Sequence, residues 1–269
     1  MDYEPEWQAA LEAAKLAGEV LREEYQRFQE IPDAPVDIST IADRKSQETI
    51  IQYLQKLFPD DAYCGEEDTP SLQDAEKDRP RTWIIDPIDG TRGFARKNGE
   101  FSVMIGFTVD NIPQVGVVAE PAIKRTTYAV RGQGCWVVHD EHEPQRCHVG
   151  MTADIAAATL TQSHSKSPDQ PSKPVCLLHP QVVKETYSAG IKLALVARGE
   201  ADLYVNTYDA FHDWDICAGH ILVEEAGGKV TGLNGETIVY GSPGAWQKSR
   251  LLATNGVLHA TALEGLRGL

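Results

Sequence analysis

The first sixty residues carry the hydrophobic spacing of two amphipathic helices. Between residues 7 and 28 apolar side chains recur every three or four positions, with acidic and basic residues between them, which predicts a helix. A second helix is predicted from about residue 41 to residue 58, where Pro59 and Asp60 end it. Two helices therefore precede the first strand.

Short apolar runs replace the helical spacing after residue 80. The run from Trp83 to Ile85 predicts a buried strand that stops at Asp86. Turn residues then separate further predicted strands over residues 101–109, 114–119, 126–130 and 135–138. This series predicts an antiparallel meander, which the polar stretch 139–149 ends.

Strands and helices alternate from residue 157 onward. Strands are predicted over residues 160–162, 175–178, 202–205 and 251–254, and helices over 189–198, 214–226 and the C-terminus. The loop 163–174, rich in Ser, Pro and Lys, is the predicted mobile segment. We therefore expect two halves with an active site between them. Residues 1–149 form an α+β half with two helices and an antiparallel sheet, and residues 150–269 form an α/β half.

The charge balance narrows the classes of partner. Of 269 residues, 25 are Lys or Arg and 40 are Asp or Glu, so the formal net charge is −15 and the field repels nucleic-acid polymers. No apolar run approaches about 18 residues and no signal sequence is present, so neither membrane insertion nor secretion is expected. Five scattered cysteines without a CxxC pair suit a reducing compartment, so we expect a cytoplasmic protein. A small anionic substrate then requires bound cations or a helix N-terminus that inverts the local field.

Acidic residues in three separate segments carry the candidate chemistry. Each segment places carboxylates after a strand or at the start of a helix: Glu66 and Glu67, Asp86 and Asp89, Asp213 and Asp215. Clustered carboxylates repel one another and raise each other's pKa, so such a cluster is expected where divalent cations neutralise it. Oxygen ligands select Mg²⁺ or Mn²⁺ over zinc. The acids therefore predict metal-dependent hydrolysis of a phosphate ester.

Other metal-ligating residues do not have the pattern of a site. His139, His142, Cys147 and His148 lie on a polar hairpin loop without zinc-ligand spacing, so no zinc site is expected. Cys217 lies inside the predicted 214–226 helix. We interpret it as a packing residue or, alternatively, as an oxidation-sensitive thiol near the site.

Three segments together resemble the inositol monophosphatase superfamily of Mg²⁺-dependent, lithium-sensitive phosphatases. They are Glu66 in Gly-Glu-Glu, the stretch from Trp83 to Thr91, and Trp214-Asp215 followed by Ile-Cys-Ala-Gly-His-Ile-Leu-Val-Glu-Glu-Ala-Gly-Gly. The resemblance covers nearly the whole chain and implies an α+β fold, the layered αβαβα sandwich of the sugar phosphatases. It also implies two or three Mg²⁺ ions, with Mn²⁺ able to replace them and Li⁺ inhibitory.

The same resemblance implies roles for single residues. Its metal ligands would be the side chains of Glu66, Asp86, Asp89 and Asp215 and the backbone carbonyl of Ile88, with Glu67 in the outer shell. Asp43 would lie beside Thr91 and activate the attacking water. A hydroxyl that bridges a carboxylate and a water relays a proton where neither group alone reaches.

Two further stretches bear on the substrate. Residues 161–166 and 188–199 resemble the 3′(2′),5′-bisphosphate nucleotidase branch, which removes the 3′-phosphate of adenosine 3′,5′-bisphosphate. For that substrate Lys192 and His164 would hold the second phosphate. The expected substrate contacts are then Gly90, Thr91, His164, Gly190 and Lys192.

The sequence departs from that branch at two positions. Ala189 stands where well-studied members carry Ser, and Asn206 lies where they tend to carry an Arg nearby. Inositol monophosphatase and fructose-1,6-bisphosphatase activities therefore stay open, and so does an inactive sensor of phosphorylated ligands. In each case the partner is a small phosphorylated molecule, and the chain is a monomer or a homodimer.

Overall fold

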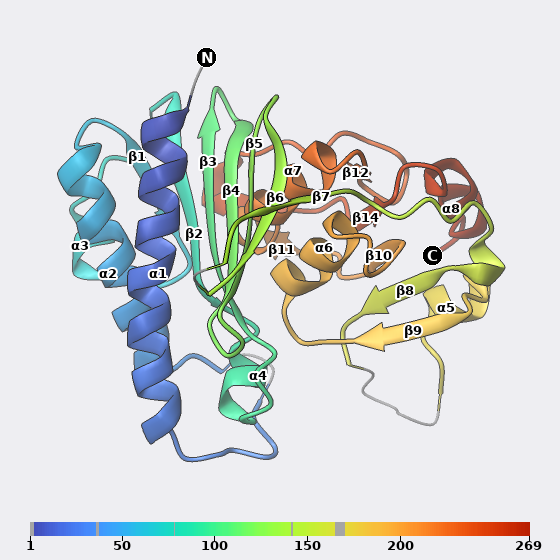
Figure 1. The fold of residues 1–269 in the computed structure, drawn as a ribbon, viewed down its shortest axis with the longest axis horizontal. Coiled ribbons are helices and arrows are strands. Elements are labelled where there is room, and N and C mark those ends of the chain that lie inside the picture. Colours follow the sequence, from blue (N-terminus) through green and yellow to red (C-terminus); the bar gives the residue numbers. More distant parts are fainter. Residues whose placement is uncertain (1–2, 36–37, 78, 141, 165–169) are drawn as a thin grey trace.

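The helices and strands of this chain stack in five alternating layers (Figure 1). The computed structural model describes residues 3–35, 38–77, 79–140, 142–164 and 170–269. A helix pair, a seven-stranded sheet, a second helix pair, a five-stranded sheet and a third helix pair follow one another. The predicted α+β class and αβαβα sandwich are confirmed.

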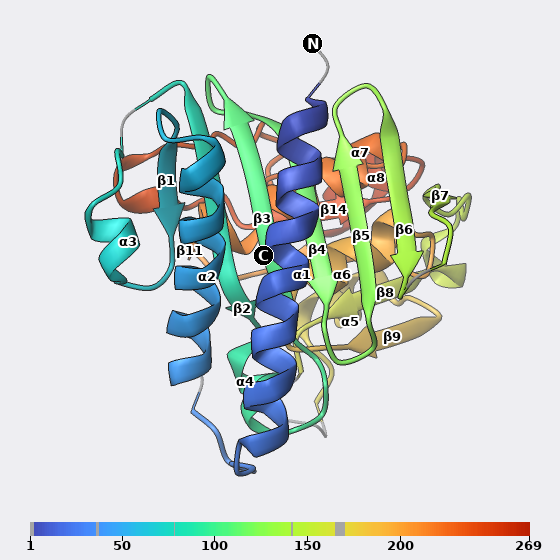
Figure 2. The same ribbon diagram turned by 60° about the vertical axis from the view of Figure 1, so that its left-hand side comes forward.

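Two long helices, α1 (Glu4–Arg27) and α2 (Ile41–Leu57), form the first layer. Figure 2 shows them lying across the outer face of the large sheet. The buried side of α1 is rich in alanine, and Ala10, Ala13 and Ala17 are fully buried. These small side chains let the helix lie close to the strands beneath it. Both predicted N-terminal helices are therefore present.

The large sheet contains seven strands that neighbour one another in chain order. They are β1 (Ala62–Gly65), β2 (Arg81–Asp89), β3 (Ser102–Val109), β4 (Ile112–Glu120), β5 (Arg125–Val130), β6 (Gly134–His139) and β7 (Gln145–Cys147). β1 pairs with β2 in parallel, and every later neighbour pairs antiparallel. The predicted meander is confirmed, but it continues into β7 inside the stretch predicted to end it.

The second half of the chain supplies the remaining layers. Helices α6 (Ala189–Ala197) and α7 (Cys217–Glu225) lie between the sheets, and α5 (Lys173–Leu178) and α8 (His259–Gly265) lie on the far side. The small sheet has the order β12 (Lys229–Thr231), β14 (Leu251–Thr254), β10 (Leu203–Asn206), β8 (Thr159–Gln162) and β9 (Val182–Glu185). Short elements complete the chain: α3 (Pro70–Gln73), α4 (Thr91–Ala95), β11 (Phe211–His212), β13 (Trp246–Gln247) and the 3-10 turns Ile155–Ala157, Asp213–Asp215 and Pro243–Ala245.

Apolar side chains fill each space between layers. One core joins α1 and α2 to the large sheet around Trp83 and Phe107. A second surrounds α6 and α7 and includes Cys217, which is fully buried as a packing residue. A third lies between the small sheet and helices α5 and α8. Because α6 and α7 contact both sheets, the division into halves 1–149 and 150–269 stays a prediction.

Two predicted elements differ in the structure, and one strand was not predicted. The run 175–178 is wrong as a strand, because Ser172 caps a helix there by accepting a hydrogen bond from the backbone of Val175. The nearby strand is β9, whose four residues are all exposed and so carry no buried alternation. The helix predicted over 214–226 begins instead with a 3-10 turn, and α7 starts at Cys217.

Two other expectations concern the mobility of the loop 163–174 and the absence of membrane-spanning helices. The loop predicted as mobile, 163–174, includes residues 165–169, which lie outside the described residues, and its last two residues belong to α5. Among the described residues, no helix has the length and apolarity needed to cross a membrane.

Candidate active site

A bulge at the end of β2 turns its two acids toward one pocket. Asp86 lies opposite Met104 of β3 and Asp89 lies opposite Ser102, so β2 holds one extra residue between them. Pro87 falls in this interval, and proline cannot donate to a sheet. The N–H of Ile88 instead donates to the carboxylate of Asp86 at 3.1 Å. The bulge breaks the alternation that would send the two acids to opposite faces.

Gly90 makes the sharp turn that follows. Its backbone is left-handed, with φ of 88°, and it caps the short helix α4. A Cβ at this position would lie 2.6 Å from the carbonyl oxygen of Glu100. Glycine alone therefore fits here, and the turn brings Thr91 back toward the acids.

Asp43 and Thr91 meet across 48 positions of sequence. One carboxylate oxygen of Asp43 accepts hydrogen bonds from the N–H and the hydroxyl of Thr40, both at 2.7 Å, which caps α2. The other oxygen lies 2.9 Å from the hydroxyl of Thr91, and the carbonyl of Ile88 lies at the same distance from that hydroxyl. Burial raises the pKa of Asp43 to about 6. The structure thus brings this predicted pair together.

The remaining acids raise one another's pKa. Glu66 is an exposed residue of the pocket lining, but protein atoms around its carboxylate remove part of the hydration of that group. This loss of hydration, together with the nearby Asp215 and Asp43, raises the pKa of Glu66 to about 8. Burial, Glu66 and Asp89 raise the pKa of Asp86. Burial is also the largest cause that raises the pKa of Asp215 to about 7. This group gains from any cation placed among its members.

Helix α6 anchors the last acid, Asp89. The backbone N–H of Gly190 donates to its carboxylate at 2.6 Å, and the hydroxyl of Ser188 donates to the same oxygen. A Cβ on Gly190 would lie 2.7 Å from the hydroxyl of Ser102. Gly190 is therefore placed behind Asp89, where it holds the carboxylate.

Most of the acidic residues and the Gly90 turn line one pocket of about 410 Å³. Its walls include all five predicted metal-ligating residues, and also Gly90, Thr91 and His164. Arg92, Ser163, His164, Tyr187 and Tyr208 also line it, and these five residues are called the far wall below. The predicted ligands and three of the predicted substrate contacts therefore share one cavity.

His164 is held firmly in that far wall. Its Nε2 lies 2.6 Å from Glu100, and its Nδ1 lies 3.5 Å from Glu185. The ring centroids of His164 and Tyr187 are 4.3 Å apart. The guanidinium of Arg92 lies 5.4 Å from the centre of the Tyr187 ring.

Lys192 lies behind the wall and is only 1% exposed. Its ammonium donates at 3.0 to 3.1 Å to the hydroxyl of Ser163 and to the carbonyls of Thr186 and Tyr187. These bonds engage all three of its donors. The structure does not bring Lys192 to the pocket surface, and the residue instead positions the segment that carries Tyr187.

The donor set fits divalent cations of the Mg²⁺ class. Within the described residues, no three His, Cys, Asp or Glu side chains already stand as a complete metal site. Asp89 bonds to α6, and Asp215 accepts a 2.5 Å hydrogen bond from the backbone of His212. However, the four acids and Ile88 line one cavity and all offer oxygen donors. Burial and mutual repulsion raise the pKa values of Glu66, Asp86 and Asp215, and a bound cation would relieve both effects.

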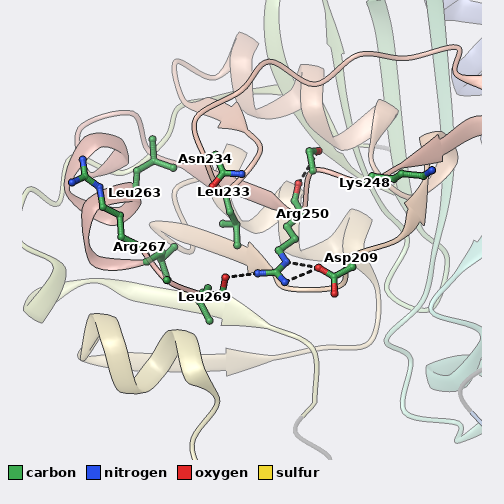
Figure 3. Close-up of a pocket in the computed structure, with 11 residues that line it drawn as sticks. Asp209, Leu233, Asn234, Lys248, Arg250, Leu263, Arg267 and Leu269 are labelled. Atoms are coloured by element: carbon green, nitrogen blue, oxygen red, sulfur yellow. Dashed lines mark hydrogen bonds and ion pairs between the residues drawn. The ribbon is translucent and has the colours of Figure 1, made fainter.

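A second cavity, of about 590 Å³, lies near the C-terminus (Figure 3). Its Arg250 pairs with Asp209 at 2.6 Å and donates to the carbonyl of Leu269 at 2.7 Å. Because this arginine is already satisfied and the acidic group lies elsewhere, the cavity offers none of the chemistry of the first pocket.

The comparison with protein families agrees with this geometry. A model described as the inositol monophosphatase family matches residues 2–268. The chain belongs to the inositol monophosphatase family. It is therefore a member of a phosphatase family whose proteins generally use divalent metals such as Mg²⁺.

Relatives within the inositol monophosphatase family carry several different names. A histidinol-phosphatase of Mycobacterium tuberculosis is 31% identical over 262 residues, which is 96% of each chain. A 3′(2′),5′-bisphosphate nucleotidase CysQ of Aggregatibacter actinomycetemcomitans is 30% identical over 87% of this chain and 86% of its own. The solved inositol monophosphatase of Anabaena has a TM-score of 0.80 at 28% identity, covering 99% of this chain and 96% of the other. Family membership therefore leaves the substrate open.

Sequence reasoning missed most of the far wall of this family member. Tyr187 and Tyr208 lie outside the acidic motifs, and nothing in their local sequence indicates a site. The same holds for Glu100, which does not line the pocket but contacts His164 there. Arg92 is the exception, because it directly follows Thr91 in the motif already singled out.

Proposed function

We propose that this chain is a Mg²⁺-dependent phosphomonoesterase. The side chains of Glu66, Asp86, Asp89 and Asp215 and the carbonyl of Ile88 would hold the cations. The observation that carries the proposal is the Thr91 hydroxyl, which lies 2.9 Å from both the Asp43 carboxylate and the Ile88 carbonyl at the wall of the acidic pocket. When bound, the cations supply Lewis-acid stabilisation of the phosphoryl oxygens and favour ionisation of a water.

Thr91 and Asp43 accept the proton of the attacking water in this proposal. Thr91 donates its hydroxyl hydrogen toward Asp43, which leaves an oxygen lone pair open to a water in the pocket. As the water attacks phosphorus, its proton passes to the Thr91 oxygen while the Thr91 proton passes to Asp43. Burial favours the protonated form of Asp43, so the carboxylate is a competent acceptor.

We propose that the leaving group carries a second phosphate, as in adenosine 3′,5′-bisphosphate. Arg92 lies on the far wall, with its guanidinium 5.4 Å from the centre of the Tyr187 ring, and it brings a positive charge to the pocket. A phosphate oxygen accepts charge-assisted hydrogen bonds from a guanidinium. Tyr187 and Tyr208 on the same wall offer aromatic surface to a planar base. The nucleotidase relative supports this substrate.

A monoester with a cationic leaving group is the second candidate. Glu100 and Glu185 flank His164 and place negative charge behind the same wall, and a positively charged alcohol is attracted by that charge. The histidinol-phosphatase relative supports this alternative.

A phosphate-release assay tests the proposal. The panel contains adenosine 3′,5′-bisphosphate, histidinol phosphate, inositol 1-phosphate and fructose 1,6-bisphosphate, each with Mg²⁺, with Mn²⁺, with chelator and with added Li⁺. We expect turnover that needs Mg²⁺ or Mn²⁺, falls with Li⁺ and favours the nucleotide. Asp86→Asn should lose at least about 10³-fold in turnover, whereas Asp60→Asn, the same change at an exposed acid after α2, is the matched control with a small effect. Binding of these esters without turnover would instead indicate a sensor.

A further inference from the structure

Two cysteines face each other at the edge of the large sheet, far from the acidic pocket. Cys135 of β6 is the direct cross-strand partner of Cys147 of β7. Opposite residues of antiparallel strands have Cα atoms about 4.5 to 5.5 Å apart, which lies within the span of a disulfide. Both thiols are buried in the same apolar core. A bond between their sulfur atoms is therefore compatible with the existing pairing of β6 and β7.

A buried arginine lies beside this thiol pair. The side chain of Arg198 is 4% exposed, and its guanidinium donates to Glu120 at 3.1 Å, to Thr127 at 2.8 Å and to Glu200 at 2.5 Å. Among the described residues, its Nη2 is buried and has no hydrogen-bond partner. The adjacent Cys135 thiol and the charge of Arg198 lower the pKa of the Cys147 thiol, and they outweigh the opposing effects of burial and of Glu200. A nearby cation favours the thiolate, which is the reactive form.

The strand that carries Cys147 is easily opened. β7 has three residues and is the last strand of the sheet, so within the described part of the chain it pairs with β6 alone. Its other two residues, Gln145 and Arg146, are exposed, and Figure 2 shows the strand at the end of the large sheet. Short edge strands open locally at low free-energy cost. A small oxidant therefore reaches Cys147 before it reaches Cys135.

We propose that Cys135 and Cys147 form a reversible disulfide site that reacts with hydrogen peroxide or an organic hydroperoxide. The Cys147 thiolate attacks the peroxide oxygen, and the O–O bond breaks to give a sulfenic acid and water or the corresponding alcohol. The Cys135 sulfur then attacks the sulfenic sulfur and releases water. In total, two thiols are oxidised to one disulfide while one hydrogen peroxide is reduced to two waters. A dithiol reductant reverses the reaction by thiol–disulfide exchange.

The other three cysteines serve as internal controls. Cys176 is exposed, Cys64 is half-buried and Cys217 is buried. Cys176 is therefore the thiol that simple exposure would select, whereas the geometry selects the Cys135 and Cys147 pair.

Peptide mapping of the full chain tests the site. The reduced protein is treated with one equivalent of hydrogen peroxide, alkylated and digested without reductant. We expect one cross-linked peptide joining Cys135 to Cys147, the loss of two alkylated thiols, and full recovery after dithiothreitol. Cys147→Ala should abolish the cross-link, and Cys176→Ala should leave it unchanged. Because the wild-type map needs no variant, a folding defect in Cys147→Ala leaves the test intact.

The rate of cross-link formation tests the role of Arg198. Arg198→Met should slow cross-link formation about tenfold, while the control Arg146→Met, which removes an exposed charge from β7, should not. Equal rates would overturn the role of Arg198. Oxidation that yields only Cys176 products, or sulfinic acid at Cys147 without a cross-link, would overturn the disulfide site.

Discussion

The backbone N–H of Gly190 donates a 2.6 Å hydrogen bond to the carboxylate of Asp89, across 101 positions of sequence. This bond joins the first turn of α6 to the end of β2 and lies between the two sheets. The orientation of one acid of the pocket therefore depends on how closely α6 approaches β3.

Gly190→Ala tests that dependence. The new Cβ would lie 2.7 Å from the hydroxyl of Ser102 and 2.8 Å from the sulfur of Met104, so α6 must shift away from Asp89. We expect a destabilisation of about 1 to 3 kcal/mol and a loss of turnover of about tenfold or more. Thermal unfolding and steady-state kinetics measure the two effects. Gly18→Ala is the matched control, because its Cβ has room in the helix α1, and wild-type behaviour of both variants would contradict the positioning role.

The position of a site residue could be predicted from the sequence where the neighbouring site residues belong to the same short motif. The acids of β2 and the Gly90 turn belong to one short motif, so their proximity follows from the chain itself. The pairing of Asp43 with Thr91 came from the family resemblance, because no local signal joins residues 48 positions apart.

The burial of Lys192 was not predictable from its helix alone. A lysine near a helix start is ordinarily solvated, whereas here the carbonyls of Thr186 and Tyr187 turn inward to meet it. The same limit explains the error at 175–178. Four apolar residues suit a buried strand or a short helix equally, and the cap at Ser172 decides between them.

Thr91→Ala should affect catalysis more than binding. Without the hydroxyl, a water in the pocket has no relay to Asp43, and kcat is expected to fall by about 10² to 10⁴-fold with little change in KM. Thr91→Ser keeps the hydroxyl and should retain most of the activity. A main effect of Thr91→Ala on KM would show that the hydroxyl serves recognition instead.

The metal-free protein should lose stability as pH rises. The pKa is raised to about 6 at Asp43, about 7 at Asp215 and about 8 at Glu66, while the unfolded chain titrates near the ordinary carboxyl values. Between about pH 4 and pH 8 the folded state therefore binds more protons than the unfolded state, so stability falls with rising pH. Unfolding with chelator present measures the slope. Mg²⁺ should flatten it, and so should Asp215→Asn; a slope that Mg²⁺ leaves unchanged would argue against metal binding by these acids.

Lys192→Met should lower activity toward every substrate alike. Methionine keeps the length of the side chain but leaves the carbonyls of Thr186 and Tyr187 without their donor, at an expected cost of about 1 to 3 kcal/mol in stability. The wall that carries Tyr187 then loosens for monophosphate and bisphosphate equally. Kinetics with inositol 1-phosphate and adenosine 3′,5′-bisphosphate measure the two losses. A loss confined to the bisphosphate would show that Lys192 contacts the second phosphate, as the sequence resemblance implied.

Arg92→Gln separates the two candidate substrates. If Arg92 binds the second phosphate, the variant should lose about 10- to 100-fold in kcat/KM for adenosine 3′,5′-bisphosphate, the usual effect of one charge-assisted hydrogen bond. Inositol 1-phosphate offers no group to this position, so its turnover should hardly change.

Arg96→Gln is the matched control, because Arg96 also lies over the Tyr187 ring, at 6.0 Å, but is not among the residues that line the pocket. Rising salt should weaken the bisphosphate preference in the wild type and leave Arg92→Gln unaffected, because a contact in an open pocket is screened. Equal losses for both substrates would assign Arg92 to the shared phosphate and favour the monoester.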